Sequence, residues 1–96
     1  MSNFRPDYAA CREYFLELAK ASKGTLRRAH NPTPGPDGLA LSTDFLRLGP
    51  EDAEHALIMV SGTHGAEGFA GSAIQCAWLA AAPKLPDNLA VVLVHG

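Results

Sequence analysis

Two uninterrupted apolar runs in the second half of the chain constrain its fold most strongly. Residues 56–61 read Ala-Leu-Ile-Met-Val-Ser, and residues 89–94 read Leu-Ala-Val-Val-Leu-Val. Apolar runs without polar alternation are typical of strands that are covered on both faces of a sheet. The segment between them, residues 69–82, has helical apolar spacing and ends before Pro83. A strand, a helix and a strand in this order predict a βαβ unit with parallel strands and a right-handed crossover.

The first half of the chain predicts a capped helix followed by a hairpin. Asp7 is a suitable N-cap for a helix that runs to about Ser22. Residues 25–30 and 39–48 have the character of two strands, joined at residues 31–38 by a turn rich in proline and glycine. We expect these two strands to pair at an edge of the sheet.

Together these elements predict an α/β fold: an N-terminal helix and an edge β-hairpin, followed by a βαβ unit in a partial mixed sheet. Charge is distributed unevenly, because residues 56–96 contain only Glu67, Lys84 and Asp87. A segment with so little polar surface is expected to form the interior of something larger. We therefore expect residues 1–96 to be the N-terminal part of a single α/β domain that is truncated.

The same patterns predict which surfaces are buried. In the helix at residues 69–82, one side consists of Phe69, Ala73, Cys76 or Ala77, and Ala80. If half of the covering layers are absent, apolar strand residues meet water, and the free chain is expected to aggregate. The strand at residues 91–94 contains no charge or proline, and we expect self-association through its exposed edge.

Composition and charge exclude several classes of function. Eight basic and ten acidic residues leave a net charge of −2, which offers no electrostatic basis for binding nucleic acid. No apolar run approaches the roughly 18 residues of a membrane span, and residues 1–7 lack the apolar stretch of a secretory signal. Cys11 and Cys76 fall in helical segments, which predicts two buried thiols in a reducing, cytoplasmic setting.

The segment that could carry chemistry is the glycine-rich loop at residues 61–71, between a strand and a helix. His64 and Glu67 bring an imidazole and a carboxylate into this loop, and a set of two histidines and one glutamate is a known catalytic zinc arrangement. The loop has no lysine for a phosphate loop, and its glycine spacing does not match a dinucleotide fingerprint. A structural role stays open, in which His64 and Glu67 pair with each other or cap the following helix.

The remaining histidines are weaker candidates. His30 and His55 flank predicted strands in polar contexts, and we expect both to be solvated. His95 ends the last strand near the same carboxyl edge as the glycine-rich loop, and we interpret it first as a structural residue of the strand end. Indirect support of a metal ligand is the alternative interpretation. The Arg27-Arg28 pair is interpreted as an exposed feature of its strand.

Residues 57–72 resemble the first zinc-ligand loop of the zinc carboxypeptidase superfamily. They are most similar to an uncharacterised bacterial branch beside the succinylglutamate desuccinylase and aspartoacylase-like enzymes, and the similarity extends from Tyr8 to His95. The resemblance implies that His64 and Glu67 bind zinc. It also implies a zinc-dependent hydrolase that cleaves amide or peptide bonds in small-molecule or peptide substrates.

The resemblance further implies that part of the catalytic machinery lies elsewhere. The family's third zinc ligand, a second histidine, lies far downstream of this loop, as do its substrate-binding arginine and its general-base glutamate. Two protein ligands leave zinc at least two positions short of a tetrahedral set. We therefore expect the 96-residue chain to bind zinc weakly and to be inactive as a hydrolase. The opposing hypothesis is a small non-catalytic α/β module for binding or interaction.

Overall fold

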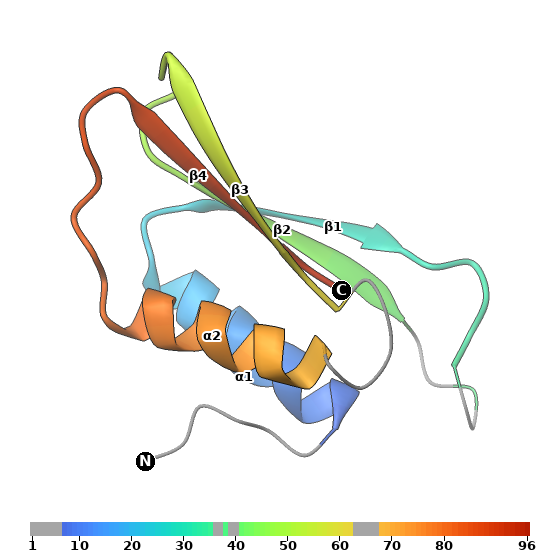
Figure 1. Cartoon of the computed structure of the whole chain (residues 1–96). Coiled ribbons are helices and arrows are strands. Elements are labelled where there is room, and N and C mark those ends of the chain that lie inside the picture. Colours follow the sequence, from blue (N-terminus) through green and yellow to red (C-terminus); the bar gives the residue numbers. More distant parts are fainter. Residues whose placement is uncertain (1–6, 36–37, 39–40, 63–67) are drawn as a thin grey trace.

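The computed structural model describes residues 7–35, 38, 41–62 and 68–96. Two helices lie on the same face of a four-stranded sheet (Figure 1). This arrangement confirms the α/β fold that the sequence predicts. Neither helix has the length and hydropathy needed to cross a membrane, within the described part of the chain. In chain order the elements are α1 (Tyr8–Ala21), β1 (Thr25–His30), β2 (Ser42–Leu48), β3 (His55–Ser61), α2 (Gly68–Ala80) and β4 (Leu89–His95).

The strands follow the order β1-β2-β4-β3 across the sheet. β1 and β2 form an antiparallel hairpin, and β2 pairs antiparallel with β4. β3 and β4 are parallel, with Ser61 opposite His95, and α2 connects them. The edge hairpin and the βαβ unit are therefore confirmed, and the carboxyl ends of β3 and β4 meet at one edge of the sheet.

Helix α1 begins at the cap that the sequence predicts. The Asp7 carboxylate accepts a hydrogen bond of 2.8 Å from the Ala10 N–H, as N-cap side chains do. At the other end, Ser22 Oγ donates to the Ala19 carbonyl at 2.6 Å and satisfies one of the last helical acceptors. Residues three and four apart share a helix face, and the buried face of α1 consists of Cys11, Phe15 and Ala19.

The hydrophobic core lies between the two helices and the face of the sheet that they cover (Figure 1). Phe15 of α1, Leu46 of β2 and Leu93 of β4 are fully buried in it. Trp78 of α2 packs against this core from its partly buried rim. One core therefore joins both helices to the sheet; its buried members are Phe15, Ala19, Leu46, Cys76, Leu79, Val91 and Leu93.

The buried face of α2 differs from the sequence prediction. On the predicted side Cys76 is buried, but Ala77 and Ala80 are exposed. The helix instead directs two polar side chains, Ser72 and Gln75, into the interior beside Cys76 and Leu79. Both polar groups find hydrogen-bond partners there, and this offsets the cost of burying them.

The position of β3 is a second correction. Its apolar run predicted a strand covered on both faces, but β3 lies at the edge of the sheet and no described helix covers its far face. Leu57 is 49% exposed, Ile58 is 62% exposed and Val60 is 58% exposed. β4 takes the interior position between β2 and β3. The strand at residues 91–94 is therefore not a free edge, contrary to the prediction.

We expect the edge of β3 to mediate self-association of the isolated chain. No strand in the described part of the chain pairs with its outer side, and unpaired backbone groups beside apolar side chains favour pairing with another copy. Ile58→Lys should shift sedimentation toward monomer, because a charge on an edge strand opposes such pairing. Ile74→Lys is the control, since Ile74 is similarly exposed (65%) but lies on α2. Equal association of Ile58→Lys and the unmodified chain would contradict this expectation.

Candidate functional site

The predicted metal ligands His64 and Glu67 lie outside the described residues, but the glycines that bound their loop are described. Gly62 follows β3 with a φ of 75°, and Gly68 begins α2. A Cβ atom at Gly62 would come 2.5 Å from the carbonyl oxygen of Gly96, and one at Gly68 would come 2.7 Å from Cα of Gly62. Backbone crowding therefore requires glycine at both positions. Both lie at the carboxyl edge shared by β3 and β4.

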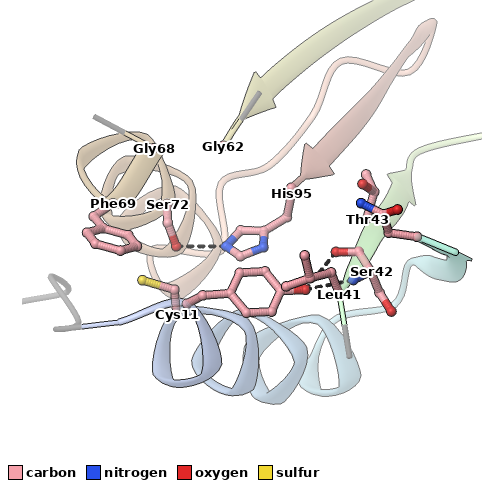
Figure 2. A pocket seen from close by; sticks show the side chains of 12 residues that line it. Cys11, Leu41, Ser42, Thr43, Gly62, Gly68, Phe69, Ser72 and His95 are labelled. Carbon is pink, nitrogen blue, oxygen red and sulfur yellow. Dashed lines mark hydrogen bonds between the residues drawn. The ribbon is translucent and has the colours of Figure 1, made fainter. Parts of the chain in front are cut away.

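His95 is buried beside this edge, at the end of β4. The residue is 1% exposed, and its ring stacks on Phe15 with the two centroids 4.4 Å apart. Its Nε2 lies 2.7 Å from Oγ of Ser72 in α2 (Figure 2). Its Nδ1 is buried and has no hydrogen-bond partner among the described residues. Support of a zinc ligand by His95 stays a prediction, because those ligands lie outside the described part of the chain.

Burial lowers the pKa of His95 below its ordinary value of 6.5, because a desolvated imidazole resists a positive charge. The carboxylate of Asp44 acts in the opposite direction, and the guanidinium of Arg12 lowers the pKa further. His95 is therefore neutral at pH 7. A neutral imidazole has one N–H donor and one acceptor nitrogen.

We expect the folded chain to lose stability as the pH falls below about 6.5. The unfolded chain then binds a proton at His95 that the folded chain, with its lowered pKa, does not bind. The free energy of unfolding should fall by up to about 1.4 kcal/mol per pH unit in this range. Urea unfolding at a series of pH values measures the slope. The slope should shrink in His95→Gln, which cannot titrate, and an unchanged slope in that variant would contradict the assignment.

Asp44 forms a buried ion pair that sequence reasoning missed. The residue is fully buried in β2, and it accepts hydrogen bonds from Nε of Arg12 at 2.9 Å and from Nη2 of Arg12 at 3.2 Å. Arg27 and Arg28 are both exposed in β1, as predicted, and Nε of Arg28 also lies 3.5 Å from the same carboxylate. Strand alternation could have indicated that Asp44 is buried, because Asp44 lies on the same side of β2 as Leu46.

Gln75 connects α2 to both parallel strands. Its Oε1 accepts a hydrogen bond of 3.0 Å from Ser61 Oγ. Its Nε2 donates to the carbonyl of Met59 in β3 at 2.9 Å and to the carbonyl of Val94 in β4 at 3.3 Å. One buried amide thus holds the helix against the carboxyl ends of two neighbouring strands. Sequence reasoning missed Gln75 because a single glutamine in a helix has no distinctive signal.

A cavity of about 270 Å³ lies at this carboxyl edge. Figure 2 shows side chains from α1, α2 and β4 around it, among them Cys11, Phe69, Ser72 and His95. Gly62 and Gly68, which bound the predicted ligand loop, also line it. In α/β proteins, ligands bind outside the carboxyl ends of the strands. The cavity is therefore the candidate site for a ligand.

The described residues alone do not form a metal site. Across the described ranges, no three side chains of His, Cys, Asp or Glu lie close enough to hold a metal ion. His30 and His55 are exposed, as predicted, and His30 Nδ1 lies 3.0 Å from Ser42 Oγ. A zinc site in this chain would have to include residues outside those ranges, where His64 and Glu67 occur.

Comparisons with known proteins place the fold in context. The glutaminyl cyclase of Porphyromonas gingivalis is similar in structure, with a TM-score of 0.62 and 14% sequence identity over 97% of this chain. The matched region covers 38% of the glutaminyl cyclase chain. A search of curated proteins found no match. A family model described as a protein of unknown function, DUF2817, matches residues 4–96, and this chain therefore belongs to that family.

Proposed function

We propose that this chain forms the part of a zinc-dependent hydrolase that carries the first metal-ligand loop, and that the enzyme cleaves an amide or peptide bond. The main supporting observation is that Gly62 and Gly68, which bound the loop with His64 and Glu67, lie at the carboxyl edge of parallel strands. Ligand sites of α/β proteins occur at this edge. The resemblance to the zinc carboxypeptidase superfamily assigns the two ligands.

In the proposed enzyme, two residues of this chain would bind the metal and two others would orient the loop that contains them. The His64 imidazole and the Glu67 carboxylate would hold the metal. Bound zinc would supply Lewis-acid polarisation of the substrate carbonyl and a water whose pKa is lowered toward about 7. Ser72 and Gln75 attach the first turns of α2 to the strand ends. This attachment would orient the ligand loop that precedes the helix, since supporting hydrogen bonds tune metal ligands.

The isolated chain is not expected to hydrolyse a substrate. The resemblance assigns the third ligand and the general base to sequence far downstream of the loop, and this chain matches 38% of the glutaminyl cyclase chain. Loss of members of a catalytic unit costs orders of magnitude in rate. We therefore propose that activity requires further protein, and that the described fold supplies one part of the site.

Calorimetric titration with Zn²⁺ tests the ligand assignment. We expect weak binding by the unmodified chain, and His64→Ala and Glu67→Ala should each weaken it by at least about tenfold. His55→Ala is the matched control, because His55 is exposed at the opposite end of β3. If both loop variants bind Zn²⁺ as well as the control does, the proposed function fails.

The second candidate is a small non-catalytic module for binding or interaction. The exposed apolar residues of β3, Leu57, Ile58 and Val60, favour it because exposed apolar patches mark interaction surfaces. The same titration separates the two candidates. Zn²⁺ binding that depends on His64 and Glu67 supports the hydrolase, whereas its absence supports the module.

A further inference from the structure

We propose that the open face of the sheet, the face opposite the two helices, binds an amphipathic helix of a partner protein whose apolar side is flanked by acidic residues. Both helices of the described chain lie on the other face of the sheet (Figure 1). The proposed docking goes beyond the hydrolase function, and it holds whether or not the chain binds zinc.

The register of the strands shows which side chains share the open face. Residues directly opposite each other on neighbouring strands lie on the same face, and successive residues of one strand point to opposite faces. Leu46 of β2 and Leu93 of β4 point into the core between the sheet and the helices, so the residues on either side of them point the other way. The open face therefore carries two rows that cross all four strands, Ile58–Val92–Arg47–Thr25 and Val60–Val94–Phe45–Arg27.

Both rows change from apolar to basic in the same direction. Over β3 and β4 they contain four branched apolar side chains, of which Ile58 and Val60 are exposed and Val92 and Val94 are half-buried. Over β2 and β1 each row contains one arginine. Contiguous exposed apolar side chains with a polar border mark an interaction surface, so the open face has an apolar half and a basic half.

A groove of about 650 Å³ lies in the basic half. Every residue of its lining belongs to the described ranges; they are Thr25, Arg27, Arg28, Phe45, Arg47, Glu51 and Val92. Five of these seven residues are members of the two rows. The groove therefore opens on the same face as the apolar side chains of β3 and β4.

The arginines of the two rows are available to bind acidic groups. Neither Arg27 nor Arg47 forms an ion pair with a described residue, whereas Arg28 pairs with buried Asp44. Glu51 is the single acidic residue of the lining, so the groove has a net positive charge.

The guanidinium of Arg47 is also held in place. It donates hydrogen bonds to the carbonyl of Gly49 at 3.3 Å and to the carbonyl of Pro50 at 2.7 Å. These carbonyls carry no full charge, and a guanidinium has five N–H donors. Further donors of Arg47 can therefore bind a carboxylate, and less side-chain entropy is lost because the group is already positioned.

A helix matches the dimensions of this face. A helix is about 10 Å wide, and neighbouring strands lie about 4.8 Å apart. A helix that packs on the apolar side chains of β3 and β4 therefore places one flank beside Arg47 and Arg27. Carboxylates on that flank would form paired hydrogen bonds with the guanidinium groups, whereas ammonium groups there would be repelled.

A second copy of this chain does not match the open face. The apolar sides of α1 and α2 are already buried in the core, so neither helix can fill this role. If two open faces packed together, the arginines of one copy would lie against arginines or against apolar side chains of the other. The first arrangement is repulsive, and the second removes a guanidinium from water without a counter-charge. The occupant is therefore a different protein segment.

Binding of two synthetic helical peptides, followed by NMR chemical shifts, tests the proposal. Each peptide has about 18 residues, which is enough for a helix in water, and a stripe of leucines. One carries glutamates along one flank, and the other carries lysines at the same positions. We expect the glutamate peptide to shift the amides of Val92 and Val94 and to bind at least about tenfold more tightly than the lysine peptide. Added salt should reduce this difference.

Variants of the two halves of the open face make the test specific. Arg27→Glu should reverse the preference, so that the lysine peptide binds more tightly than the glutamate peptide. Lys84→Glu is the matched control, because it makes the same charge change at an exposed position outside the groove. Val60→Ser should weaken both peptides by at least about threefold, since it removes apolar contact without changing charge. Arg27 and Val60 are both exposed, so these variants should fold.

Several outcomes would overturn the proposal. They are equal binding of the two peptides, failure of both to bind, an unchanged preference in Arg27→Glu, undiminished binding in Val60→Ser, and shifts confined to α1 and α2. Amide shifts of Phe45 and Val92 that depend on protein concentration without peptide would place a second copy on this face and reject the proposed partner. The Zn²⁺ titration is independent of these outcomes, so either result can fail alone.

Discussion

Replacing Asp44 with alanine is expected to lower the free energy of unfolding by about 3–5 kcal/mol. The carboxylate is fully buried and receives two hydrogen bonds from Arg12. The side chain of Arg12 is itself 23% exposed, so in the variant its guanidinium has little water and no strong counter-charge. An uncompensated buried charge is far more costly than a missing pair. Because small domains have only about 5–15 kcal/mol of stability in total, much of it would be lost.

Two companion variants separate this explanation from a general loss of packing. Arg28→Ala should cost less than about 1 kcal/mol, the usual value for exposed pairs, because the Arg28 side chain is 44% exposed and its Nε is 3.5 Å from the carboxylate. The double variant Arg12→Leu with Asp44→Leu removes both charges and should be more stable than Asp44→Ala. Urea unfolding followed by circular dichroism measures all three. A double variant no better than Asp44→Ala would refute the role of the unpaired charge.

Replacing Gln75 with alanine is expected to cost about 2–4 kcal/mol of unfolding free energy. Gln75 is 2% exposed, and its amide makes hydrogen bonds with Ser61, Met59 and Val94. Truncation leaves the buried hydroxyl of Ser61 without this acceptor and opens a void between α2 and the sheet. The loss should be greatest at the carboxyl ends of β3 and β4, where these bonds are made.

Hydrogen exchange of the backbone amides locates the effect of this substitution. In Gln75→Ala, amides near Ser61 and Val94 should exchange faster, while those of the β1–β2 hairpin should change less. Gln75→Met keeps most of the volume and should fall between the unmodified chain and Gln75→Ala. Ile74→Ala, at the exposed neighbouring position, should have little effect. Equally faster amide exchange across the whole sheet would contradict the expectation that Gln75 stabilises only the carboxyl ends of β3 and β4.

The elements of this fold could be predicted because their signals are local. Asp7 caps α1 through an N–H three residues away. The proline- and glycine-rich segment of the sequence predicted the hairpin that β1 and β2 form. The two apolar runs with a helix between them were sufficient to predict that β3 and β4 pair in parallel. Each of these signals depends on residues that are close in sequence or on a simple period.

The polar interior of the site could not be predicted in the same way. Ser72 and Gln75 are polar residues of α2 that the hydrophobic spacing did not identify as buried, and Asp44 is an acidic residue in a strand. Each is buried because its partner arrives from a distant part of the chain: His95 for Ser72, Ser61 for Gln75 and Arg12 for Asp44. Burial of a polar group is favourable only with such a partner. No local sequence pattern indicates whether a hydrogen-bond partner from a distant segment lies beside the polar group.

The positions of β3 and β4 illustrate the same division. Both strands are apolar runs that fit the interior of a sheet equally well, and the sequence alone could establish that they are parallel neighbours around a helix. The tertiary structure decided that β2 pairs with β4, which makes β4 interior and leaves β3 at the edge with Ile58 and Val60 exposed. Local hydrogen bonds and periodicity specify each element, whereas strand order depends on which distant backbone edges pair when the core closes.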